Sequence, residues 1–73
     1  MVPNERNPVT PQDVGKRVSF QYELPNGFIT EVVGTLEYFD EGANTYVVRP
    51  KSGELAHVPR RGVRFGKVVP SAP

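Results

Sequence analysis

The chain has 73 residues and a net charge of +1, with eight prolines, seven glycines, one histidine and no cysteine. A chain of this length forms one small domain, so a two-domain enzyme is excluded, and so are a disulfide framework and a cysteine-ligated zinc site. Twelve valines, four threonines and one isoleucine, interrupted by the prolines and glycines, favour short strands joined by turns.

The two ends of the chain differ in composition from its middle. Residues 1–12 contain three prolines and few apolar side chains, so we expect a disordered leader. Residues 70–73, Pro-Ser-Ala-Pro, have the composition of a linker or tail, which leaves residues 13–69 as the folded domain. No apolar run approaches the roughly 18 residues that cross a bilayer, and no signal peptide is recognisable, so we expect a cytoplasmic protein.

The first predicted structural unit is a β-hairpin. Residues 17–24 alternate apolar and polar side chains, as in a half-buried strand. Asn26 and Gly27 follow, and this pair is a strong hairpin signal because both residue types tolerate positive φ. A two-residue turn at this pair would place Phe20 opposite Val33 on the returning strand.

Turn residues divide the rest of the chain into further short strands. Five strands are predicted in all, over residues 17–24, 28–39, 45–49, 54–58 and 63–69. Gly34 predicts a bulge or bend in the second strand, and residues 59–62 fit one 3-10 turn before the last strand. Five short strands in a flat sheet would leave one face wet and both edges open. We therefore predict an all-β, five-stranded SH3-like or Sm-like small barrel, with an open meander as the alternative.

Residues that could perform catalysis are few. His57 alternates with apolar neighbours on a predicted strand, which favours a barrel-wall or rim position over a catalytic base. Asp40 and Glu41 lie in a polar turn, where solvent keeps carboxylates unsuited to acid catalysis. No nucleophile elbow and no glycine-rich phosphate loop is recognisable. We expect no catalytic, cofactor-binding or metal-binding residue in this chain.

Charge is distributed unevenly along the chain. Residues 1–48 hold three Lys/Arg and seven Asp/Glu, whereas residues 49–73 hold six Lys/Arg and one Asp/Glu. The candidate contacts to an anion or nucleic acid are these six basic residues: Arg49, Lys51, Arg60, Arg61, Arg64 and Lys67. Basic residues interleaved with aromatic ones are used to bind single-stranded nucleic acid. The isoelectric point of 8.1 lies below the value of about 9 typical of such domains, so an ordinary solvated face is favoured.

Six short motifs follow one another between Asp13 and Pro70. They are Gly15-Lys16-Arg17-Val18, Leu24-Pro25-Asn26-Gly27, Thr30-Glu31-Val32-Val33-Gly34, Val47-Val48-Arg49, Gly53-Glu54 and Val58-Pro59. In order and spacing this series resembles the SH3-like small β-barrel that precedes the catalytic domain in actinobacterial N-acetyltransferases of the GNAT superfamily. The resemblance covers about four-fifths of the chain.

The resemblance implies a non-catalytic accessory domain with a positioning, interaction or regulatory role. In that family acetyl-CoA binds the downstream catalytic domain, whose pyrophosphate loop has no counterpart here, so no cofactor is expected in this chain. The implied partner is the downstream acetyltransferase domain or another protein, and no membrane or metal is expected. The basic turn at residues 59–62 departs from the family pattern, which keeps a nucleic-acid-binding barrel as the alternative.

Overall fold

The protein is an antiparallel sheet of five strands, seen in a computed structural model that describes residues 9–70. The elements are the 3-10 turn η2 (Pro11–Asp13), β1 (Arg17–Glu23), β2 (Ile29–Asp40), β3 (Thr45–Pro50), β4 (Ala56–Pro59), the 3-10 turn η3 (Arg60–Gly62) and β5 (Val63–Val68). The strands are ordered β4-β3-β2-β1-β5 in space. The predicted all-β class and the turn before the last strand are confirmed.

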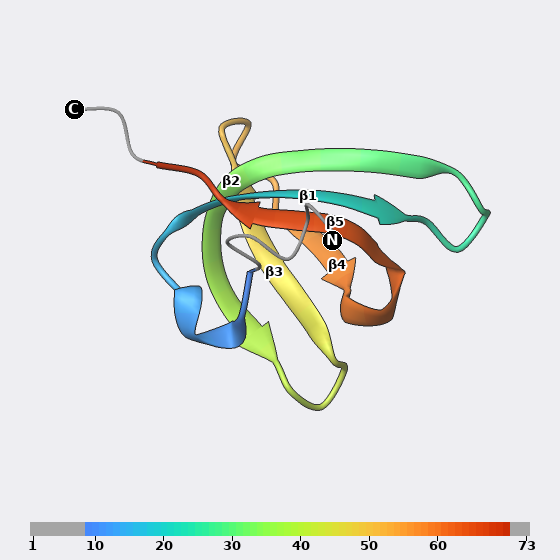
Figure 1. The fold of residues 1–73 in the computed structure, drawn as a ribbon, viewed down its shortest axis with the longest axis horizontal. Helices are drawn as coiled ribbons and strands as arrows, with labels where there is room; N and C mark the ends of the chain where they lie inside the picture. The colour runs from blue at the N-terminus through green and yellow to red at the C-terminus, as the bar shows by residue number, and fades with distance from the viewer. Residues whose placement is uncertain (1–8, 71–73) are drawn as a thin grey trace, which may run out of the picture.

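Strand β2 is the longest strand, and it makes the sheet curl. Its first half pairs with β1 as far as Thr35, and its second half pairs with β3 from Gly34 onward. Figure 1 shows β2 as a long arc, which pairs with β1 along one part of its length and with β3 along the other. A Cβ on Gly34 would collide with the carbonyl oxygen of Arg49 and lie 2.7 Å from the Cα of Pro50. Gly34 is therefore a point of close approach between two backbones, which only glycine permits. The irregularity in the β2–β3 register, which marks a bulge, lies between Leu36 and Tyr38 and not at Gly34.

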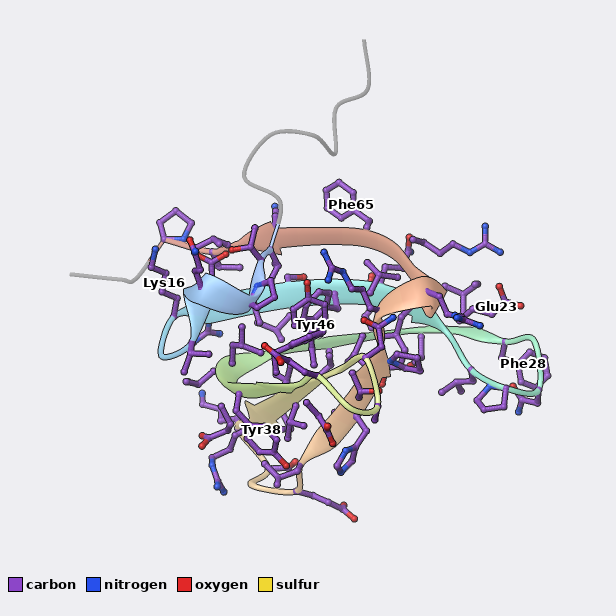
Figure 2. The ribbon with its side chains drawn as sticks, turned by 90° about the horizontal axis from the view of Figure 1, so that it is seen from below. Lys16, Glu23, Phe28, Tyr38, Tyr46 and Phe65 are labelled. Carbon is purple, nitrogen blue, oxygen red and sulfur yellow. The ribbon has the colours of Figure 1, made fainter. Side chains whose placement is uncertain are left out.

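The curled sheet encloses one apolar core. The core comprises Val18, Phe20, Tyr22, Val32, Leu36, Tyr46, Val48 and Val58. Phe20 and Tyr46 lie in contact, with ring centroids 4.9 Å apart, and Figure 2 shows Tyr46 between the two halves of the sheet. Within residues 9–70 the edge strands β4 and β5 do not pair with each other, so the sheet curls without being closed by hydrogen bonds.

The turn between β1 and β2 has three residues, where the sequence predicted two. The N–H of Leu24 donates to the carbonyl of Phe28 at 2.7 Å, which encloses Pro25, Asn26 and Gly27. Gly27 has a φ of 91°, whereas Asn26 does not take the positive φ that a two-residue turn requires. The Asn26 side-chain oxygen accepts the N–H of Phe28 instead, at 3.0 Å. This local bond stabilises the longer turn.

The extra turn residue shifts the β1–β2 register by one position. Phe20 lies opposite Val32, and the predicted pairing of Phe20 with Val33 is wrong. Because side chains alternate between the faces of a strand, Val32 enters the core, whereas Val33 points outward and is 40% exposed. The same shift leaves Ile29 on the outer face, opposite Glu23.

We expect Gly27→Ala to lower the free energy of unfolding by about 1–2 kcal/mol, because alanine is strained at positive φ. No steric clash contributes, since a Cβ there would meet nothing within 4 Å. Urea denaturation measures the change. Gly27→Asn is the control and should retain most of the stability, because asparagine tolerates this conformation. Equal losses in both variants would contradict the assignment of the effect to φ.

The start of the described chain corrects one expectation. Residues 1–8 of the expected leader lie outside the described residues, but residues 9–12 belong to the domain. Val9 packs against the core, and its carbonyl accepts a hydrogen bond from the Tyr46 hydroxyl at 3.3 Å. Thr10 and Asp13 form a capping box around η2, and the N–H of Thr10 holds the pKa of Asp13 below its ordinary value. Residues 71–73 of the expected tail also lie outside the described residues.

Candidate functional site

The six basic residues predicted as anion contacts do not form one patch. Arg60 and Arg64 line one surface hollow, Arg49 and Lys51 line a second, and Arg61 lines a third. Lys67 is exposed on β5 and lines none of these three hollows. The basic residues are therefore divided between η3 with β5, which hold Arg60, Arg61, Arg64 and Lys67, and the end of β3, where Arg49 and Lys51 lie.

The first hollow, of about 260 Å³, lies beside β5 and η3 and has an aromatic floor. Its lining residues are Val9, Phe20, Tyr46, Arg60, Val63, Arg64, Phe65 and Gly66. The Arg60 guanidinium lies 5.6 Å from the centroid of the Phe39 ring, a cation–π contact. Arg64 donates to the Glu23 carboxylate at 2.8 Å, which offsets part of the positive charge. The buried rings of Phe20 and Tyr46 belong to the core, so this hollow is a depression in the surface directly above the core.

Tyr46 links this hollow to the stability of the fold. Burial raises the pKa of its hydroxyl above 10.0, Arg60 opposes the shift and Asp13 adds to it. The unfolded chain therefore releases this proton at a lower pH than the folded chain does. The stability that neutral Tyr46 contributes is present below about pH 10 and is lost as the pH rises through the folded-state pKa.

We expect Tyr46→Phe to cost about 1 kcal/mol at neutral pH, because the hydrogen bond to Val9 is lost. Above about pH 10 the wild type should lose stability more steeply than the variant, which has no hydroxyl to ionise at this position. Urea denaturation from about pH 9 to about pH 11 measures both curves. Parallel curves over this range would contradict the effect of burial on the Tyr46 pKa.

The third hollow, of about 320 Å³, lies where β1 ends, also beside η3. It is lined by Glu23, Leu24, Pro25, Pro59, Arg61 and Gly62. A carboxylate shares this hollow with the single guanidinium, so its charge does not favour an anion. The side chain of Arg61 is nevertheless exposed, so its replacement serves as a control for replacing the basic residues of the second hollow, described next.

The second hollow, of about 270 Å³, gathers the most positive charge, and we name it the basic hollow. It is lined by Arg17, Val33, Gly34, Thr35, Arg49, Pro50 and Lys51. Arg17, Thr35 and Arg49 are register partners, so they form a row across β1, β2 and β3. Lys51 follows directly after β3, in the turn to β4. The sequence prediction missed Arg17, because only the strand register brings it beside residues more than thirty positions away.

An acidic side chain, that of Glu37, pairs with one of the arginines of the basic hollow. The Arg49 Nε donates to the Glu37 carboxylate at 2.8 Å, and Nη1 donates to the carbonyl of Gly53 at 3.4 Å. These two contacts orient the guanidinium, although the Arg49 side chain is 51% exposed. The arrangement offers cationic and hydroxyl donors for an anion and contains no acid–base pair, so the chemistry it supports is binding.

The remaining predicted features fall outside the hollows. His57 is exposed on β4, where it pairs with Val47. Of the three tyrosines, Tyr22 and Tyr46 are buried, whereas Tyr38 is 49% exposed. Within residues 9–70 no cluster of three or more His, Cys, Asp or Glu side chains could hold a metal ion. The described residues also include no helix long and apolar enough to cross a membrane.

Comparison with known proteins gives one family. The family model described as the Rv0428c N-terminal Sm-like domain matches residues 12–67. No curated protein and no solved structure gives a significant match. The matched range begins within η2 and ends one residue before the end of β5, so it includes all the strands that build the core and the basic hollow. The chain therefore belongs to the family of the Rv0428c N-terminal Sm-like domain.

Proposed function

We propose that this chain is a non-catalytic accessory domain of a GNAT-type N-acetyltransferase. The main support for this proposal is the family match over residues 12–67. The family is described as an N-terminal domain, and thus as one part of a longer protein. The six motifs that resemble the barrel preceding GNAT catalytic domains support the choice of a GNAT-type enzyme. In this proposal acetyl-CoA binds the catalytic domain, and the Sm-like domain positions that domain or recruits a partner.

The outer face of the first hairpin supplies a surface for such positioning. Three apolar side chains are exposed there, Phe28 at 70%, Ile29 at 46% and Val33 at 40%, and we name them the β2 apolar row. Figure 2 shows Phe28 at the far end of the hairpin, away from the core. Covering these side chains removes apolar surface from water and stabilises a docked domain by about 25 cal/mol per Å² of buried apolar area.

The coding sequence that follows Pro73 tests the enzyme connection, and a longer polypeptide that binds acetyl-CoA is the expected result. Amide spectra of residues 1–73, alone and within that polypeptide, should differ at the β2 apolar row. Ile29→Ser should weaken the docking. Val14→Ser is the control, because Val14 is similarly exposed, at 49%, outside the row. A stop codon directly after Pro73, or identical spectra, would contradict the proposal.

The second candidate function is a nucleic-acid-binding barrel that uses the six basic residues. Two exposed arginines in η3, with Arg60 over the Phe39 ring, favour it. The division of the cations over separate hollows weighs against it, as do the ion pairs of Arg49 and Arg64. Titration with an oligonucleotide at low salt decides between the two functions. Amide shifts at η3 that weaken at moderate salt would support this candidate, and unchanged spectra would eliminate it.

A further inference from the structure

The basic hollow has the geometry of an anion site built from three neighbouring strands. Adjacent strands lie about 4.8 Å apart, so Arg17 and Arg49 flank Thr35 at a separation of about 10 Å between their backbones. Long side chains from these positions, and from Lys51 at the rim, can converge on one small group. Thr35 lies between the two arginines and adds an uncharged hydroxyl donor.

The site is partly preorganised. The Arg49 guanidinium is held through Nε by Glu37 and through Nη1 by the carbonyl of Gly53, and within residues 9–70 its Nη2 has no hydrogen-bond partner. Gly34 contributes backbone without a side chain to the wall of the hollow, beside Pro50. A donor that is already fixed loses less conformational entropy when an anion binds.

Charge selects the class of anion. Arg17, Arg49 and Lys51 bring three positive charges, and Glu37 brings one negative charge, which leaves a local surplus of two. A phosphate monoester carries about −1.5 to −2 at pH 7, whereas a carboxylate or a phosphodiester carries about −1. We propose that the basic hollow binds the dianionic phosphate group of a small phosphate monoester. This proposal is independent of the accessory role, although the basic hollow adjoins the β2 apolar row and shares Val33 with it.

Amide spectra of the isotope-labelled chain during titration with methyl phosphate and with dimethyl phosphate test the proposal. Methyl phosphate is expected to shift the amides of Gly34, Thr35 and Arg49 with a Kd on the order of 1–10 mM. Dimethyl phosphate, with one charge fewer, should bind about fivefold more weakly. Equal binding of the two esters would overturn the proposal, and so would the absence of shifts with methyl phosphate up to about 50 mM.

Matched variants separate a specific site from general attraction by positive charge. Arg17→Gln and Lys51→Gln should each weaken the binding of methyl phosphate by about three- to fivefold. Arg61→Gln removes the same charge at the other end of β1 and should leave the Kd unchanged. An equal loss in the Arg61 variant would overturn the proposal. Unchanged amide dispersion in the unliganded variants verifies that each is folded.

The source of the phosphate group is distinguished by three further probes. The first probe, inorganic phosphate, is a free anion. The second, a nucleoside 5′-monophosphate, is a monoester, and the third, an oligonucleotide without terminal phosphates, contains only phosphodiesters. Binding of the first two with shifts at Gly34 and Thr35, and none there with the oligonucleotide, is the expected result. Tighter binding of the oligonucleotide at the same amides would overturn the monoester assignment and favour the nucleic-acid function.

Discussion

Replacing Gly34 with alanine is expected to lower the free energy of unfolding by about 3 kcal/mol. The added Cβ would collide with the Arg49 carbonyl oxygen and lie 2.7 Å from the Arg49 carbonyl carbon and the Pro50 Cα. These are backbone atoms of the paired strand β3, so a change of rotamer cannot relieve the clash. The two strands must separate, and the separation disturbs the pairing where β2 changes partners from β1 to β3.

Urea or thermal denaturation of Gly34→Ala measures this cost, and Gly42→Ala is its control. A Cβ on Gly42 would meet only the Asp40 carboxylate oxygen, at 3.5 Å, in an exposed turn. The control variant should remain within about 0.5 kcal/mol of the wild type. If the two alanine variants were equally stable, the close crossing of β2 and β3 would not be what restricts residue 34 to glycine.

Phe20→Ala is expected to cost about 3–5 kcal/mol of the free energy of unfolding. Phe20 is 1% exposed and packs against the Tyr46 ring at a centroid distance of 4.9 Å. Truncation removes this buried area and leaves a cavity in the only core cluster identified within residues 9–70. Small domains are stabilised by only about 5 kcal/mol at the lower end, so between about 3% and about 50% of the variant should be unfolded at 25 °C.

Phe28→Ala is the matched control for Phe20→Ala, because the same side chain is deleted where it is 70% exposed. Its expected effect on stability is within about 0.5 kcal/mol. Circular dichroism during thermal denaturation compares both variants with the wild type. A loss from Phe28→Ala as large as that from Phe20→Ala would contradict the position of the core. In the longer polypeptide, Phe28→Ala should instead weaken docking through the β2 apolar row.

The close approach of β2 and β3 at Gly34 also connects the fold to the proposed phosphate site. The same close approach that excludes a side chain at residue 34 places Thr35 beside Arg49 and opens the basic hollow next to Pro50. A Gly34→Ala variant that remained partly folded should therefore bind methyl phosphate more weakly. Arg17→Gln, in contrast, should weaken binding with little loss of stability, because its exposed side chain removes no core contact.

Local patterns in the sequence predicted the elements closely. Alternation of apolar and polar residues gave β1, β3 and β5 to within one residue at each end, and two residues separate the predicted and observed starts of β4. Residues 59–62 predicted η3 with its preceding proline, whereas the bulge predicted at Gly34 lies between Leu36 and Tyr38. These features depend on residues that are neighbours in the chain, so the necessary information is local.

The site was only partly predictable. The charge count along the sequence indicated a basic C-terminal third. It grouped together residues that lie apart in the fold, such as Arg49 in the basic hollow and Arg61 near Glu23. It also omitted Arg17, which lies in the acidic part of the sequence. Neither the ion pair of Arg49 with Glu37 nor that of Arg64 with Glu23 is visible from charge counts. Strand register brings these residues together, and register is a property of paired segments.

The sequence alone determined that this protein is a small all-β domain with a long second strand, because turn residues and side-chain alternation act over a few positions. The tertiary structure decided the three-residue turn, and with it that Val32 and not Val33 enters the core. It also decided that Val9 belongs to the domain and that Arg17 joins Arg49. These outcomes depend on hydrogen bonds and packing between distant segments, and a shift of one residue in a strand exchanges its buried and exposed faces.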